Sequence, residues 1–155
     1  MKNIHWLVSH KVKEPKDISL SNIASIRLRT ALFNLPIFNE YKLTINESID
    51  NQNDIDYLFV SKFSSNREDL ITKWLELIEN HRKNGRKIFF DYTDHHLDRK
   101  TLASQFYLAA LKSNDQIITS SEKLKNYLSP NFKNITIIKD PIEIESQRVK
   151  KNKES

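Results

Sequence analysis

Short apolar runs that favour β-structure alternate along this chain with stretches of helical periodicity, and this alternation constrains the fold most. Several runs are apolar at nearly every position, which is typical of strands that are buried on both faces of a parallel sheet. The expected strands occupy residues 3–9, 40–48, 56–63, 86–92, 116–121 and 134–141. The sequence therefore predicts a domain in which helices cover a sheet of parallel strands.

Helical stretches separate most of these strands. They are expected over residues 23–35, 67–84, 101–113 and 121–129. Ser65 or Asn66 is expected to cap the second of them, and Gly85 to end it in a left-handed conformation. We predict a Rossmann-like, doubly wound α/β fold with a mostly parallel six-stranded sheet and helices on both faces. Residues 1–144 would form this single domain, and residues 145–155 a basic tail or linker stub.

Composition excludes several classes of protein. Gly85 is the one glycine among 155 residues, so a glycine-rich phosphate loop is excluded, and the absence of cysteine excludes disulfide and thiolate chemistry. The net charge is +5, but part of it lies in residues 148–155, and the aromatic residues lie inside apolar runs. Nucleic-acid binding is therefore not expected.

The expected location follows from the lack of targeting signals. No apolar run reaches the length of about 18 residues that spans a bilayer, and the N-terminus does not resemble a signal peptide. We expect a cytoplasmic protein, with or without peripheral association with the inner membrane surface.

Titratable residues cluster where the fourth expected strand ends. The stretch IFFDYTDHHLD, residues 88–98, carries Asp91, Asp94, His95 and His96. Ligands of open parallel sheets bind at the carboxyl ends of the strands, so this loop is a candidate site. His95 can act there as a general base, since histidine titrates near neutral pH. The alternative is a solvated loop in which Asp94 makes a local turn.

The same loop is a poor candidate for a metal site. Adjacent histidines in a loop rarely converge on one ion, whereas zinc needs three or four ligands that are fixed by secondary structure. We therefore expect no metal ion and no cofactor.

Two further residues are candidates for binding an anionic ligand. Arg27 lies on the first expected helix and either reaches a phosphate or acidic group at the cleft or remains on a solvated helix face. Ser120 ends the fifth expected strand, next to Ser121. This serine pair either caps the following helix or presents its amides to an anion.

The order of these motifs resembles a known family. ASIRLR lies on the first helix, IFFDYTDHH on the fourth strand and its loop, and the stretch FYLAALKSNDQIITSSEKLKNYL is followed by ITIIKDPIE. This progression resembles the N-terminal, acceptor-side domain of GT-B glycosyltransferases of the group 1 type, over nearly the whole chain. It departs from the family in lacking a glycine-rich turn after the first strand.

The resemblance implies a function and a set of site residues. The chain would be the acceptor-side half of a truncated or split hexosyltransferase that moves a sugar from a nucleotide-diphosphate sugar to a glycan, for example in polysaccharide biosynthesis. Asp94 and His95 would be catalytic, and the ligand would contact four other residues. These substrate-binding residues are Arg27, Asp91, His96 and Ser120.

The donor sugar would require a second half, because one domain cannot hold donor and acceptor in reacting geometry. We expect a second domain, or a partner protein, to supply the donor site. The alternative function is a non-catalytic Rossmann-like module that docks a partner protein.

Overall fold

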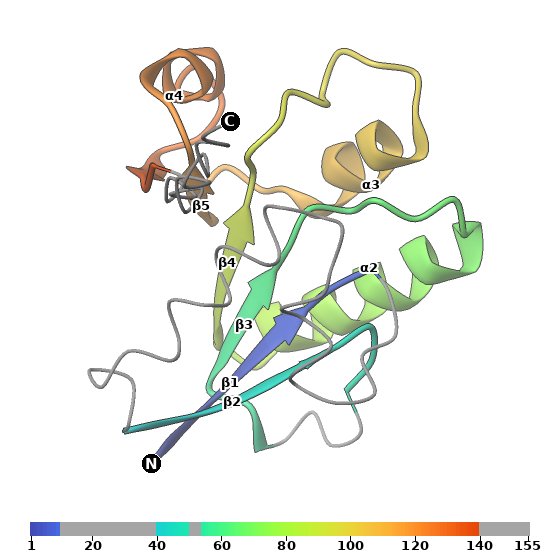
Figure 1. The fold of residues 1–155 in the computed structure, drawn as a ribbon, viewed down its shortest axis with the longest axis vertical. Helices are drawn as coiled ribbons and strands as arrows, with labels where there is room; N and C mark the ends of the chain where they lie inside the picture. The colour runs from blue at the N-terminus through green and yellow to red at the C-terminus, as the bar shows by residue number, and fades with distance from the viewer. Residues whose placement is uncertain (10–39, 50–53, 140–155) are drawn as a thin grey trace, which may run out of the picture.

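The computed structural model describes residues 1–9, 40–49 and 54–139 of the chain. Within these residues, helices and strands alternate from the third strand onward (Figure 1). In chain order the elements are β1 (Lys2–Leu7), β2 (Tyr41–Asn46), β3 (Tyr57–Val60), α2 (Glu68–Lys83), β4 (Lys87–Asp91), α3 (Leu102–Ala110), β5 (Gln116–Thr119), α4 (Glu122–Leu128) and β6 (Asn134–Ile137).

The six strands form one sheet in the order β2-β1-β3-β4-β5-β6, and every neighbouring pair is parallel. This confirms the predicted Rossmann-like α/β fold, although the described sheet is entirely rather than mostly parallel. β1 lies between β2 and β3, so the chain after β1 leads to one side of the sheet and the chain after β3 to the other. Such a reversal is a topological switch point, where ligands of open α/β sheets bind.

One buried cluster joins the sheet to all three described helices. Alternate residues of the central strands point to the same face, and α2 packs on that face through Trp74, which is fully buried. α3 adds Phe106 and α4 adds Leu128 to this cluster. The described helices therefore cover one face of the sheet. The helix expected over residues 23–35 lies outside the described residues, so helices on both faces remain a prediction.

Two of the predicted helix boundaries are confirmed. Gly85 follows α2 with a φ of 66°, the left-handed conformation that favours glycine. At the start of α4, the Ser121 hydroxyl accepts a hydrogen bond from the Leu124 amide at 3.3 Å. Both are local signals, since each depends only on residues within a few positions along the chain.

The predicted cap of α2 is wrong. The cap position is Arg67, which makes no side-chain capping bond, and Ser65 instead accepts from the Arg67 amide at 3.1 Å. The guanidinium of Arg67 binds the carboxylates of Glu47 and Asp69. Asp69 lies in the first turn, where its negative charge complements the helix dipole. The start of α2 thus carries an ionic network and no side-chain cap at Arg67.

None of the helices in the described ranges is long and apolar enough to cross a membrane.

Candidate functional site

The carboxyl ends of β1 and β3 meet at the switch point and carry polar side chains. The hydroxyl oxygens of Ser9 and Ser64 lie 2.7 Å apart, and the Ser64 amide donates to the Ser9 hydroxyl at 3.0 Å. Lys62 follows β3 and forms an ion pair with Asp94 of the loop after β4. The loops that follow three neighbouring strands are thus joined by polar contacts at one edge of the sheet.

The ion pair leaves both of its partners accessible to a ligand. Side-chain exposure is 29% for Lys62 and 51% for Asp94. Exposed pairs of this kind contribute little to stability, about 0–1 kcal/mol, because water solvates both charges. A ligand can therefore compete for either group at a small energetic cost.

Tyr92 organises the loop that carries Asp94. It is fully buried beneath α3, and its hydroxyl accepts hydrogen bonds from the amides of His96 at 2.7 Å and Leu97 at 3.2 Å. Burial raises the pKa of the Tyr92 phenol, and the two amide donors partly oppose this shift. The neutral hydroxyl therefore holds residues 93–97 as a closed turn over the end of the core.

His95, the predicted general base, is engaged within the protein. Its Nε2 lies 2.8 Å from Asp98 Oδ1, and its ring meets Tyr127 edge-on with centroids 3.9 Å apart. This hydrogen bond holds the pKa of the Asp98 carboxyl below its usual value. His95 Nδ1 is buried and has no hydrogen-bond partner in the part of the chain that the structure describes. His95 can therefore accept a proton from an external ligand only if Asp98 releases Nε2.

His96, a predicted substrate-binding residue, lies mostly inside the protein. It is 8% exposed, and its ring stacks on Tyr107 with centroids 5.4 Å apart. Burial, and secondarily the positive charge of Lys62, lower the pKa of His96. His96 therefore favours its neutral form in the folded chain, and a ligand would reach its ring only after the loop moved.

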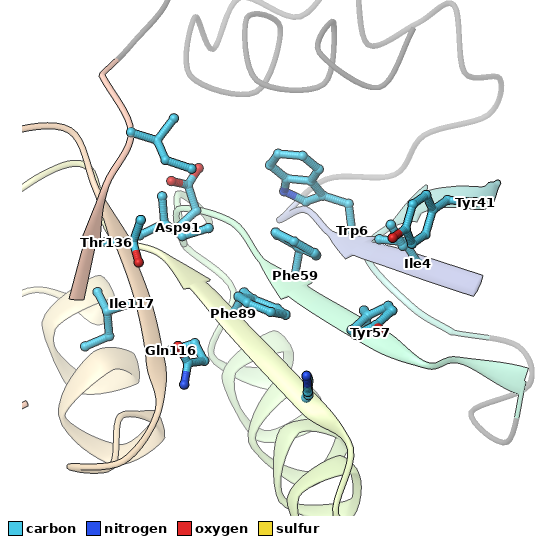
Figure 2. Close-up of a pocket in the computed structure, with 13 residues that line it drawn as sticks. Ile4, Trp6, Tyr41, Tyr57, Phe59, Phe89, Asp91, Gln116, Ile117 and Thr136 are labelled. Atoms are coloured by element: carbon cyan, nitrogen blue, oxygen red, sulfur yellow. The ribbon is translucent and has the colours of Figure 1, made fainter. Parts of the chain in front are cut away.

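Asp91 is separated from the other carboxyl-edge candidates by the pleat of β4. It is buried, and it lines a pocket of about 530 Å³ on the face of the sheet opposite the described helices (Figure 2). Figure 2 shows Trp6, Phe59 and Phe89 on neighbouring strands across the pocket floor. Phe59 and Phe89 are stacked with centroids 4.7 Å apart. Of the described lining residues, Lys87 and Asp91 are the charged ones.

Of the two remaining candidates, the structure describes Ser120 but not Arg27. The Ser120 hydroxyl donates to the Thr93 carbonyl at 3.4 Å, which ties the end of β5 to the loop after β4. Arg27 lies outside the described residues. The structure thus places Asp94, His95, His96 and Ser120 at one edge of the sheet, while Asp91 faces the pocket.

Sequence reasoning did not select the residues at the centre of this edge as site residues. Ser9 and Lys62 follow the first and third strands, where the rule for parallel sheets already indicates candidate loops. The sequence does not show that these two strands are neighbours or that Ser64 joins their ends. Tyr92 was missed because it reads as part of an apolar strand. Its position two residues before Asp94 was the available signal. No group of three or more histidine, aspartate or glutamate side chains within the described ranges could hold a metal ion.

Comparisons with protein-family models, with curated proteins and with solved structures find no match to this chain. The fold is thus described by its own topology, as a parallel six-stranded α/β sheet domain.

Proposed function

We propose that this chain is the acceptor-side half of a glycosyltransferase and binds a hydroxyl-rich acceptor at the carboxyl edge of its sheet. The observation that carries the proposal is the convergence of Ser9, Ser64, Lys62 and Asp94 at the switch point between β1 and β3. Hydroxyl groups paired with one cation and one carboxylate offer both donors and acceptors to the hydroxyls of a sugar.

The proposed roles follow from the accessibility of each group. Asp94 accepts from an acceptor hydroxyl, and Lys62 donates to an acceptor oxygen or offsets negative charge on the ligand. His95 contributes only when Asp98 releases its ring. A nucleotide-diphosphate sugar would bind with the help of a second domain or chain, whose basic groups would hold the phosphates.

A non-catalytic binding module is the second candidate, and the state of His95 favours it. Nε2 is bonded to Asp98 and Nδ1 is buried, so His95 does not present a free imidazole at the described edge. A module of this kind would use the same edge for recognition alone.

Ligand mapping tests the first candidate. Amide chemical shifts of the labelled chain would be followed during titration with a panel of oligosaccharides, nucleoside diphosphates and nucleotide-diphosphate sugars. We expect oligosaccharides to shift the amides of Ser9, Lys62, Ser64 and Asp94. Shifts confined to other surfaces, or no shift with any member of the panel, would reject the acceptor site and favour the binding module.

Substitution of Lys62 gives the matching control. Lys62→Met is expected to weaken binding about tenfold or more, because it removes a charge-assisted hydrogen bond. Lys83→Met lies at the other end of α2, away from the carboxyl edge, and should leave affinity unchanged. Equal affinities for the two variants would show that Lys62 does not contact the ligand.

A further inference from the structure

The loop after β4 is held closed by one aromatic assembly. Tyr92 accepts both the His96 and Leu97 amides, and the His96 ring lies nearly parallel to Tyr107, with an interplanar angle of 16°. Tyr92 meets the same imidazole edge-on at 6.1 Å. Tyr92, which directly follows β4, thus fixes the backbone of His96, and Tyr92 and Tyr107 of α3 together enclose its ring.

The imidazole of His96 is held in this assembly without a polar partner for one nitrogen. Nε2 is buried and, within the described residues, has no hydrogen-bond partner. A buried polar atom of this kind costs free energy, and a buried charge costs far more unless it is paired. Protonation of the imidazole would place a positive charge at this buried position, where Nε2 has no acceptor among the described residues.

Some of the charged groups around His96 disfavour its protonation, and one favours it. Lys62, from the loop after β3, disfavours a second positive charge, as do Arg99 and His95 of its own loop, while Asp94 favours it. Asp94 is already paired with Lys62. From the packed elements, Tyr92 and Tyr107 contribute phenols whose pKa values burial raises, so both remain neutral. Burial is the largest influence, and it lowers the pKa of His96.

We infer that His96 is a pH-sensitive latch, whose neutral ring closes the loop of residues 93–98 and whose protonation releases it. The loop that carries Asp94 and His95 is then closed near neutral pH and opens in acid. This latch is a property of the free chain. Its consequence, that acid weakens ligand binding at the carboxyl edge, rests on the proposed function.

Proton linkage gives the direction in which pH shifts the ratio of open to closed loop. In the open loop His96 has its ordinary pKa of about 6.5, whereas in the closed loop its pKa is lower. The open form therefore binds more protons, and acid favours it. The ratio of open to closed loop rises by up to about tenfold for each pH unit below about 6.5, until the closed form also takes up the proton.

Hydrogen exchange of the His96 and Leu97 amides tests the latch directly. Protection factors, which correct for the intrinsic pH dependence of exchange, would be measured by NMR between about pH 7.5 and pH 5. We expect both factors to fall by up to about tenfold per pH unit below about 6.5. The Phe90 amide, inside β4, should stay protected and so separates loop opening from unfolding. Protection of the loop amides that is constant over this range would overturn the latch.

Three variants separate His96 from other causes. His96→Phe keeps an aromatic ring on Tyr107 but cannot titrate, so its loop protection should not depend on pH. Tyr92→Phe removes the shared acceptor and should lower protection of both amides at every pH. His95→Gln should keep the wild-type pH dependence. A pH-dependent loss that persists in His96→Phe, or that disappears in His95→Gln, would show that His96 is not the titrating group and reject the inference.

The latch and the proposed function can each be rejected without rejecting the other. Exchange is measured on the chain without any ligand, so absence of sugar binding leaves the result intact. Conversely, an oligosaccharide that binds at Lys62 with equal affinity in wild type and in His96→Phe over the whole pH range would support the site and show that the latch does not regulate it.

Discussion

His81 provides the sharpest test of how burial controls stability in this fold. It lies in the last turns of α2, it is 0% exposed, and neither ring nitrogen has a hydrogen-bond partner among the described residues. Burial, followed by the positive charge of Arg86, lowers the pKa of His81, while the Leu77 carbonyl one turn earlier partly opposes the shift. The folded chain therefore favours neutral His81.

The pH dependence of stability follows from this direction. Because the pKa of His81 is lower in the folded than in the unfolded chain, its full contribution is present above about pH 6.5 and is lost as the pH falls. At about pH 5.5 protonation stabilises the unfolded chain by RT ln 11, about 1.4 kcal/mol, if the folded chain takes up no proton. This value is the upper limit for a single histidine.

Urea denaturation of wild type and of His81→Leu measures this contribution. The substitution changes packing by an amount that does not depend on pH, so the relevant quantity is the change with pH of the difference in unfolding free energy. Between about pH 7.5 and pH 5.5 we expect this difference to move in favour of His81→Leu by up to about 1.4 kcal/mol. His96 contributes a similar slope to both proteins and cancels in the comparison.

A difference that is constant over the pH range would refute the reasoning about His81. It would mean that the folded chain accepts the proton without penalty, for instance through a strong hydrogen bond to the Leu77 carbonyl. Burial of the His81 ring would then not make the stability of this domain depend on pH.

Two further substitutions test single contacts. Tyr107→Phe should lower the unfolding free energy by about 1–3 kcal/mol, because the Phe63 amide, which donates to the Tyr107 hydroxyl at 3.2 Å, becomes a buried donor without an acceptor; urea denaturation against the exposed-site control Tyr127→Phe measures it, and equal stabilities would contradict it. Gly85→Ala should destabilise the chain by about 1–2 kcal/mol because φ is 66° there, whereas Gly85→Asn should cost less, since asparagine tolerates that conformation. A thermal melt in which both Gly85 variants match wild type would show that the helix end can rearrange.

The sequence by itself determined the elements that the structure describes, and their order. Near-continuous apolar runs indicated buried parallel strands, and Gly85 and Ser121 marked helix boundaries, because such signals depend on residues close along the chain. The start of α2 was predicted wrongly because Arg67, and not Ser65 or Asn66, occupies the cap position, where it binds Glu47, a residue 20 positions away. Local rules do not reach such a partner.

Only the tertiary structure decided which polar residues meet. The strand order brings together Ser9 and Ser64, which are 55 positions apart, and Lys62 and Asp94, which are 32 apart. The pleat of β4 directs Asp91 to one face of the sheet and Tyr92 to the other, although the two are adjacent in sequence. A single sequence lists groups that can bind or titrate. Strand pairing and burial, which act between distant residues, determine which of them share a site and which are enclosed by the core.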